Sequence, residues 1–194
     1  MQYIDEEYFN TLEIKKSKFI AYLTPYENFD ILMQNLRNGH PKARHFVYAY
    51  RYLNEFDQIV ENSSDDGEPK GTSGKPCLSV LAGACMINSA VIVIRYFGGV
   101  KLGTGGLVKA YSDAVNLVLQ HSTLKEFVKL EYKKLIVQYA ELSQIEYLIS
   151  KFNITIKEKL FTETILLKLE SSAEEFANLS HELSHNLHLE DLES

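Results

Sequence analysis

Five of the ten glycines fall within residues 98–106. A β-branched run at 90–96 precedes this glycine loop, and an apolar helical pattern at 107–119 follows it. Glycine lets the backbone approach a ligand closely, and the free N–H groups at a helix start favour an anion. The spacing therefore predicts an anion or phosphate site; the alternative is a purely structural turn. The candidate residues are Lys75, Arg95, Gly98, Gly99, Lys101, Gly103, Thr104, Gly105, Gly106 and Lys109.

The glycine loop completes neither standard nucleotide fingerprint. Gly98 and Gly103 have the glycine spacing of a P-loop, but Thr104 and Gly105 replace the Lys-Ser/Thr pair that would hold phosphate and magnesium. In the dinucleotide pattern, Val108 stands where the third glycine belongs. The loop thus indicates a generic anion site and no particular nucleotide.

A second loop, residues 63–76, is crowded with charged and turn-forming residues. Its carboxylates could hold Mg²⁺ through water or supply a general base, although their spacing is not that of an EF-hand. The same residue types equally suit helix capping and tight turns, which need no ligand. Both interpretations stay open on the sequence alone. The candidate residues of this acidic loop are Ser64, Asp65, Asp66, Glu68 and Thr72.

A third pattern, His181-Glu182-Leu183-Ser184-His185, matches the zinc-peptidase signature and falls in a helix predicted over 173–186. Two histidines four residues apart on a helix can share a metal, and His188 extends the same face. Little chain follows to deliver a distant third ligand, so a solvated histidine face is the favoured interpretation. No resident metal or other cofactor is predicted; His181, His185 and His188 are the residues that would bind one.

Charge is unevenly distributed along the chain, whose net charge is −6. Residues 69–120 contain five basic side chains and one acidic side chain, Asp113. A cationic stretch within an acidic protein favours a local anion site over a surface that coats any polyanion. The alternative is that a buried, glycine-rich stretch has few places for carboxylates.

Composition places the chain among folded globular proteins, with 45% hydrophobic and 24% charged residues. No apolar run reaches the roughly 18 residues of a membrane helix, and residues 1–10 are polar and acidic, unlike a signal peptide. Cys77 and Cys85 form no redox or zinc motif and are expected to be core thiols in a reducing compartment. We therefore expect a cytoplasmic protein without membrane contact.

The elements that position these loops fall into two groups. Residues 1–122 are predicted to form an α/β domain, and residues 126–194 a ferredoxin-like domain with the order βαββαβ, so the fold class is α+β. The first domain has strands predicted at 13–26, 45–53 and 90–96, a further strand beginning at 59–60, and helices at 28–38, 76–86 (capped by Ser73) and 107–119. The second has strands at 127–139, 154–160, 162–169 and 187–192, and helices at 142–152 and 173–186.

The two loops resemble the YigZ/IMPACT family. The resemblance rests on three segments, Ser64–Pro69, Gly71–Pro76 and Arg95–Tyr111. Two earlier segments also fit motifs of the family, Lys16–Ala21 and Tyr48–Arg51. It covers about residues 13–120 strongly. It implies an N-terminal domain with the fold shared by a small-subunit ribosomal protein and small-metabolite kinases, including a left-handed crossover. It also implies a C-terminal domain like one found in translational elongation factors.

The resemblance also carries expectations about function. Eukaryotic relatives regulate translation initiation by competing for the activator of a starvation-responsive kinase, but an additional domain outside these motifs recognises that partner. For bacterial members it implies nucleic-acid or ribosome binding. We therefore predict a translation-associated regulatory protein that contacts RNA or the ribosome through its anion site. The alternative is an enzyme acting on a phosphorylated small molecule with metal assistance, and a metallopeptidase using His181 and His185 is a distant third. Binding is favoured over catalysis because no nucleophile–base pair is visible.

Overall fold

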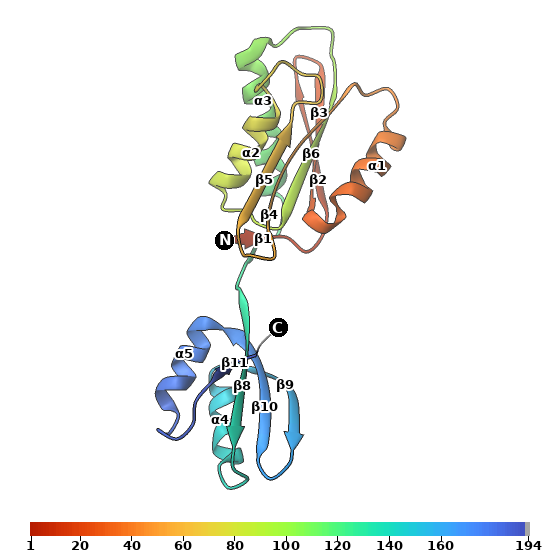
Figure 1. Cartoon of the computed structure of the whole chain (residues 1–194). Coiled ribbons are helices and arrows are strands. Elements are labelled where there is room, and N and C mark those ends of the chain that lie inside the picture. Colours follow the sequence, from red (N-terminus) through yellow and green to blue (C-terminus); the bar gives the residue numbers. More distant parts are fainter. Residues whose placement is uncertain (193–194) are drawn as a thin grey trace. The chain divides into compact units, whose positions relative to one another are not determined.

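The computed structural model describes residues 1–192, which form two compact units. Unit 1 spans Met1–Phe127, and unit 2 begins at Val128. Each unit contains its own mixture of sheet and helices, so the predicted α+β fold class is confirmed (Figure 1). Within the described chain, every helix is too short or too polar to traverse a lipid bilayer.

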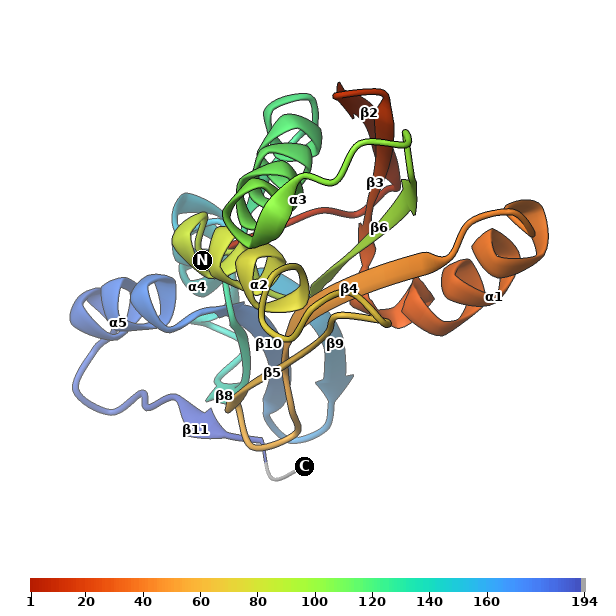
Figure 2. The ribbon, with the colours of Figure 1, turned by 90° about the horizontal axis from the view of Figure 1, so that it is seen from above.

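Unit 1 is built on a five-stranded antiparallel sheet with the order β2-β3-β6-β4-β5. One helix covers one face of this sheet and two helices cover the other (Figures 1 and 2). The strands are β2 (Tyr8–Ile14), β3 (Ser17–Pro25), β4 (His45–Leu53), β5 (Ile59–Ser64) and β6 (Ser89–Tyr96). The first face carries α1 (Phe29–Gly39) after the short η1 (Tyr26–Asn28), and the second carries α2 (Gly74–Gly83) and α3 (Gly103–Gln120). A two-stranded ribbon pairs β1 (Gln2–Tyr3) with β7 (Lys125–Glu126).

The central strand β6 explains why its sequence is a continuous apolar run. Val91 and Val93 face α2 and α3, while Ile92 and Ile94 face α1, and all four are fully buried. A strand covered on both faces has no solvent side on which polar residues would alternate. The glycine loop leaves the carboxyl end of this strand, so the core fixes where the loop begins.

Several predicted boundaries in unit 1 are wrong. The strand predicted at 13–26 is two strands, β2 and β3, joined by a two-residue turn in which Lys15 and Lys16 have φ of 46° and 64°. Tight hairpins favour positive φ at both turn residues, but lysine gives no such signal in a sequence. The helix α2 spans 74–83 in place of 76–86, and α3 begins four residues before the predicted Leu107.

Unit 2 has the order βαββαβ that the sequence predicts. Its four antiparallel strands lie in the order β11-β8-β10-β9, so β10 separates β8 from β9 in a split βαβ arrangement. Its core contains Leu135, Leu167 and Phe176. The elements are β8 (Leu130–Val137), α4 (Leu142–Lys151), β9 (Thr155–Phe161), β10 (Ile165–Ser172), α5 (Ala173–Glu182) and β11 (Glu190–Asp191).

Two further expectations are corrected by the structure. The helix α5 ends at Glu182, because Leu183 has an extended conformation, whereas the sequence predicts a helix to 186. Cys77 is buried as predicted, and burial raises the pKa of its thiol. Cys85 is exposed in the turn after α2, with a φ of 52°, and is therefore not a core thiol.

Candidate functional site

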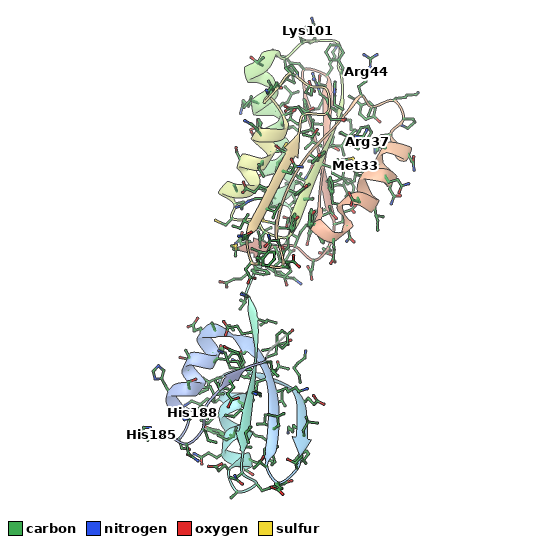
Figure 3. The ribbon with its side chains drawn as sticks, viewed as in Figure 1. Met33, Arg37, Arg44, Lys101, His185 and His188 are labelled. Carbon is green, nitrogen blue, oxygen red and sulfur yellow. The ribbon has the colours of Figure 1, made fainter. Side chains whose placement is uncertain are left out.

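Strand pairing brings separate basic segments to one end of unit 1. Lys18 of β3 pairs with Tyr96 of β6, and β4 begins beside Arg95, so the β2–β3 turn, the start of β4 and the glycine loop meet there. Figure 3 shows Lys101 and Arg44 at this end. We call this surface the cationic end and define it by Lys15, Lys16, Lys18, Lys42, Arg44, Arg95 and Lys101.

Most basic side chains of the cationic end have no protein counter-charge. Within residues 1–192, Arg95 is the one member of the set with an ion pair, to Glu68. Elsewhere most lysines and arginines pair with a carboxylate, as Lys109 does with Asp113. Two further unpaired lysines, Lys70 and Lys75, belong to the acidic loop and the start of α2. The unpaired cations thus concentrate around one end of one sheet.

A pocket of about 370 Å³ lies where the two predicted loops meet. Its lining includes Glu68 from the acidic loop, Arg95 from β6, Phe97 and Lys101 from the glycine loop, and Thr104 from the first turn of α3. We call it the α3 pocket. Because residues of both loops line this pocket, the acidic loop and the glycine loop share one cleft. The sequence alone does not decide whether they do. The first N–H groups of a helix lack intrahelical acceptors and carry partial positive charge.

A second pocket, of about 400 Å³, lies beside the first. Its lining includes Lys42, Arg44 and His45. It also includes Arg95 and Phe97, which line the α3 pocket as well. We call it the β4 pocket. His45 Nδ1 lies 2.9 Å from the carbonyl oxygen of Asp66, so the acidic loop also orients this imidazole. Each of the two pockets thus combines Phe97 with basic side chains.

Arg95 and Glu68 form a buried ion pair behind the α3 pocket. Arg95 Nη1 donates to Glu68 Oε1 at 2.5 Å, and the hydroxyl of Tyr111 donates to the same oxygen at 2.8 Å. Burial, and then the charge of Glu68, raise the pKa of Tyr111, so its hydroxyl stays a donor. Arg95 is only 7% exposed, and its enclosed Nε has no acceptor among the described residues. The guanidinium therefore keeps unused hydrogen-bonding capacity beside the pocket.

Asp65 explains why the acidic loop is so polar. Its carboxylate accepts hydrogen bonds from the backbone N–H groups of Gly71, Ser73 and Gly74 and from the Ser73 hydroxyl. Ser73 occupies the N-cap position of α2, but its side chain makes no capping hydrogen bond, so the predicted capping by Ser73 is wrong. The carboxylate of Asp65 accepts the hydrogen bonds of the first N–H groups instead. Burial opposes ionisation of Asp65, yet these hydrogen bonds outweigh burial and lower its pKa.

The other members of the acidic loop also have protein partners. Asp66 accepts from the Phe46 N–H at 2.6 Å and pairs with Arg37 at 3.2 Å. The Thr72 hydroxyl donates to the Pro69 carbonyl. Ser64 accepts from the Asp66 N–H. Glu68 pairs with Arg95, so all three loop carboxylates have partners within the fold. These contacts favour the interpretation as capping and turn residues over the magnesium alternative.

Replacing Asp65 with alanine is expected to lower the free energy of unfolding by about 2–3 kcal/mol at pH 7, because three backbone N–H groups, two of them in buried residues, lose their acceptor. A lowered pKa means that the stabilisation is present above the unfolded-state value of 3.8 and is lost as pH falls through the folded-state pKa. Urea denaturation of both proteins should therefore show a gap that narrows below about pH 4. Glu55→Ala, in the exposed β4–β5 turn, serves as the control, and a gap unchanged by acid would contradict the assignment.

The glycines of the loop have different roles. An added Cβ on Gly98 would lie 2.0 Å from the Lys16 carbonyl carbon, so this glycine permits close packing of two backbone segments. Gly99 and Gly103 have positive φ. Gly105 and Gly106 lie inside the first turn of α3, so the predicted loop is shorter than residues 98–106.

Two predicted lysines lie away from the lining of either pocket. Lys75 is exposed near the start of α2, and Lys109 is exposed on α3, where it pairs with Asp113 at 3.0 Å. Conversely, sequence reasoning left out Lys15, Lys42, Arg44 and Phe97. Lys15 and Lys42 lie in the N-terminal part of the chain, which has a negative net charge. A count of charges by segment therefore does not single them out. Only the pairing of strands brings them to the glycine loop.

The histidine motif does not form a metal site in the described residues. His181 is the helical member, but His185 follows the end of α5, so the spacing of four residues no longer places both on one helix face. Glu182 pairs with Lys151 at 2.8 Å. No group of three or more potential ligands that could hold a metal ion occurs within residues 1–192.

Comparison with known proteins identifies the family. Residues 15–119 match the model of the Impact N-terminal domain, and residues 135–187 match a domain of unknown function, DUF1949. The chain belongs to the IMPACT family. An IMPACT family member of Haemophilus influenzae is 37% identical over 89% of this chain and 85% of its own length. YigZ of Escherichia coli, also an IMPACT family member, is 36% identical over 89% and 86%, respectively.

A solved structure is similar to nearly the whole of this chain. The crystal structure of a hypothetical protein is 34% identical and superposes with a TM-score of 0.65, covering 99% of this chain and 97% of that one. The predicted resemblance is therefore confirmed for both parts of the chain.

Proposed function

We propose that this protein acts in translation and that the cationic end of unit 1 binds RNA or the ribosome. The observation that carries the proposal is the gathering of unpaired lysines and arginines around two pockets, with the start of α3 beside one of them. Phosphate groups bind to such side chains and to helix N-termini. Family membership supports the connection with translation.

The acidic net charge of the chain is compatible with this proposal. Carboxylates such as Glu27 and Glu55 lie toward the other end of the sheet of unit 1, after β3 and β4. Exposed Glu13 lies opposite Lys18 at the cationic end, but basic side chains predominate there, and such an uneven distribution orients a polyanion toward that end. Binding should therefore be specific to the cationic end and should weaken steeply with salt.

The test is co-sedimentation with ribosomes across a salt series. The variant carries Lys42→Glu, Arg44→Glu and Lys101→Glu, three exposed residues whose replacement disturbs no ion pair of the described chain. Arg95 is left intact because a carboxylate there would face buried Glu68. We expect affinity to fall at least about tenfold and the slope of log affinity against log salt to decrease by about 2–3.

The matched control reverses three exposed lysines of unit 2, through Lys151→Glu, Lys157→Glu and Lys159→Glu. It changes the net charge equally. Because it breaks the ion pairs of these lysines with Glu182, Glu170 and Glu146 and places like charges opposite each other, urea denaturation first establishes that the variant is folded. We expect the control to sediment like the unaltered protein. If both variants lose ribosome affinity equally, the loss comes from the change in net charge and not from the cationic end. A protein that never pellets, even at low salt, would contradict the proposal.

A further inference from the structure

Phe97 is an exposed aromatic side chain surrounded by cationic groups. It follows the last residue of β6 and is 59% exposed. Phe97 and Arg95 line both the α3 pocket and the β4 pocket, so the ring adjoins both. Other aromatic side chains of the chain, such as Phe56, are as exposed, but Phe97 is the one that lines both basic pockets among the described residues.

The backbone on both sides of Phe97 is fixed. Tyr96 pairs with Lys18 in the sheet, and the Gly98 N–H donates to the buried Ser17 hydroxyl at 3.1 Å. The guanidinium of Arg95 lies 5.8 Å from the centre of the Phe97 ring. The anchored backbone limits where the ring can lie, which lowers the conformational entropy lost when a flat ligand stacks on it. The structure thus presents a preorganised aromatic platform.

We propose that Phe97 is a base-stacking platform for single-stranded RNA, with the flanking phosphates bound in the α3 and β4 pockets. This inference rests on the proposed function and specifies its ligand. Two basic pockets that share an exposed ring suit the alternation of phosphates and bases along a single strand. Bases inside a duplex are stacked on one another and do not reach such a ring.

Independent support comes from the buried donor behind the platform. Arg95 is more than nine-tenths buried, and its Nε lacks an acceptor within residues 1–192. A buried donor left unpaired is costly, and a phosphate oxygen is a strong acceptor for a guanidinium. Arg95 lines both pockets, where Lys101 and the start of α3 add to the α3 pocket and Lys42 and Arg44 add to the β4 pocket.

The first measurement uses the absence of tryptophan from the chain. Phe97→Trp introduces a single indole at the platform, and Phe56→Trp introduces one at the exposed β4–β5 turn as the matched control. A short RNA without self-complementarity is titrated into each variant, while binding is followed separately by anisotropy of a labelled RNA. We expect the RNA to quench fluorescence of Phe97→Trp at the binding midpoint and to leave Phe56→Trp unchanged.

The second measurement compares the unaltered protein with Phe97→Ala. Loss of stacking should weaken single-stranded RNA binding between about fivefold and about 150-fold, without changing the salt slope because no charge is removed. Binding of the same RNA as a duplex should change little. These effects differ from those of the charge reversals, which alter the salt slope.

The outcomes separate this inference from the proposed function. If RNA binds with normal affinity to Phe97→Ala and fails to quench Phe97→Trp, the platform is wrong while binding at the cationic end stands. If no RNA or ribosome binds to the unaltered protein, both proposals are wrong. If adenosine monophosphate quenches Phe97→Trp at concentrations as low as the RNA does, the site takes a small phosphorylated molecule and the RNA inference is overturned.

Discussion

Glu68→Gln is expected to lower the free energy of unfolding of unit 1 by about 3–5 kcal/mol. The side chains of Glu68 and Arg95 are 4% and 8% exposed, so the substitution leaves a buried guanidinium without its counter-charge. The Tyr111 hydroxyl loses its charged acceptor at the same time. Urea denaturation followed by circular dichroism measures the loss, and hydrogen exchange assigns it to unit 1.

Two controls define the cause of this loss. Asp113→Asn removes an exposed carboxylate that pairs with Lys109, and such pairs contribute about 0–1 kcal/mol. The double variant Glu68→Gln, Arg95→Met removes both charges and should recover most of the stability, since replacing a whole buried pair is often neutral. Failure of the double variant to recover would show that shape, and not charge, dominates at this position.

The double variant also connects stability with binding. It keeps the fold while removing the guanidinium that lines both pockets. If Arg95 binds phosphate, this stable protein should bind RNA more weakly than the unaltered protein. Normal RNA binding by the double variant would mean that Arg95 stabilises the fold and does not bind phosphate.

Local sequence patterns predict the elements of this protein better than they predict its site. The run at 90–96 is a buried strand because each residue faces a covered side of the sheet. The βαββαβ order of unit 2 follows from periodicity alone. The hairpin at Lys15 and Lys16 escapes prediction because its turn residues are lysines, which rarely adopt positive φ.

The site depends on contacts between residues far apart in the sequence. Glu68 meets Arg95 across 27 positions, and Asp65 caps a helix that begins nine residues later. Residue types mark the acidic loop and the glycine loop as candidate sites. They do not indicate which carboxylates pair with other groups of the fold. Likewise, Arg44 reaches the glycine loop only through the pairing of β4 with β6.

Gly98→Ala is expected to destabilise unit 1 by about 3 kcal/mol. The new Cβ would lie 2.0 Å from the carbonyl carbon and 2.3 Å from the carbonyl oxygen of Lys16, and backbone atoms cannot rotate away as a side chain does. The β2–β3 turn and the glycine loop must separate. That movement also weakens the Gly98 hydrogen bond to buried Ser17. Urea denaturation and hydrogen exchange at β3 and β6 measure the effect.

Gly105→Ala is the matched control, because it makes the same chemical change seven residues later. An added Cβ on Gly105 meets nothing within 4 Å, and the residue lies in the first turn of α3. Alanine has a higher helix propensity than glycine by up to about 1 kcal/mol, so this variant should be as stable as the original or slightly more stable. Equal destabilisation by both variants would mean that the glycines act together as one flexible segment. Opposite effects would show that Gly98 is required for the glycine loop to pack against the β2–β3 turn, whereas Gly105 only begins a helix.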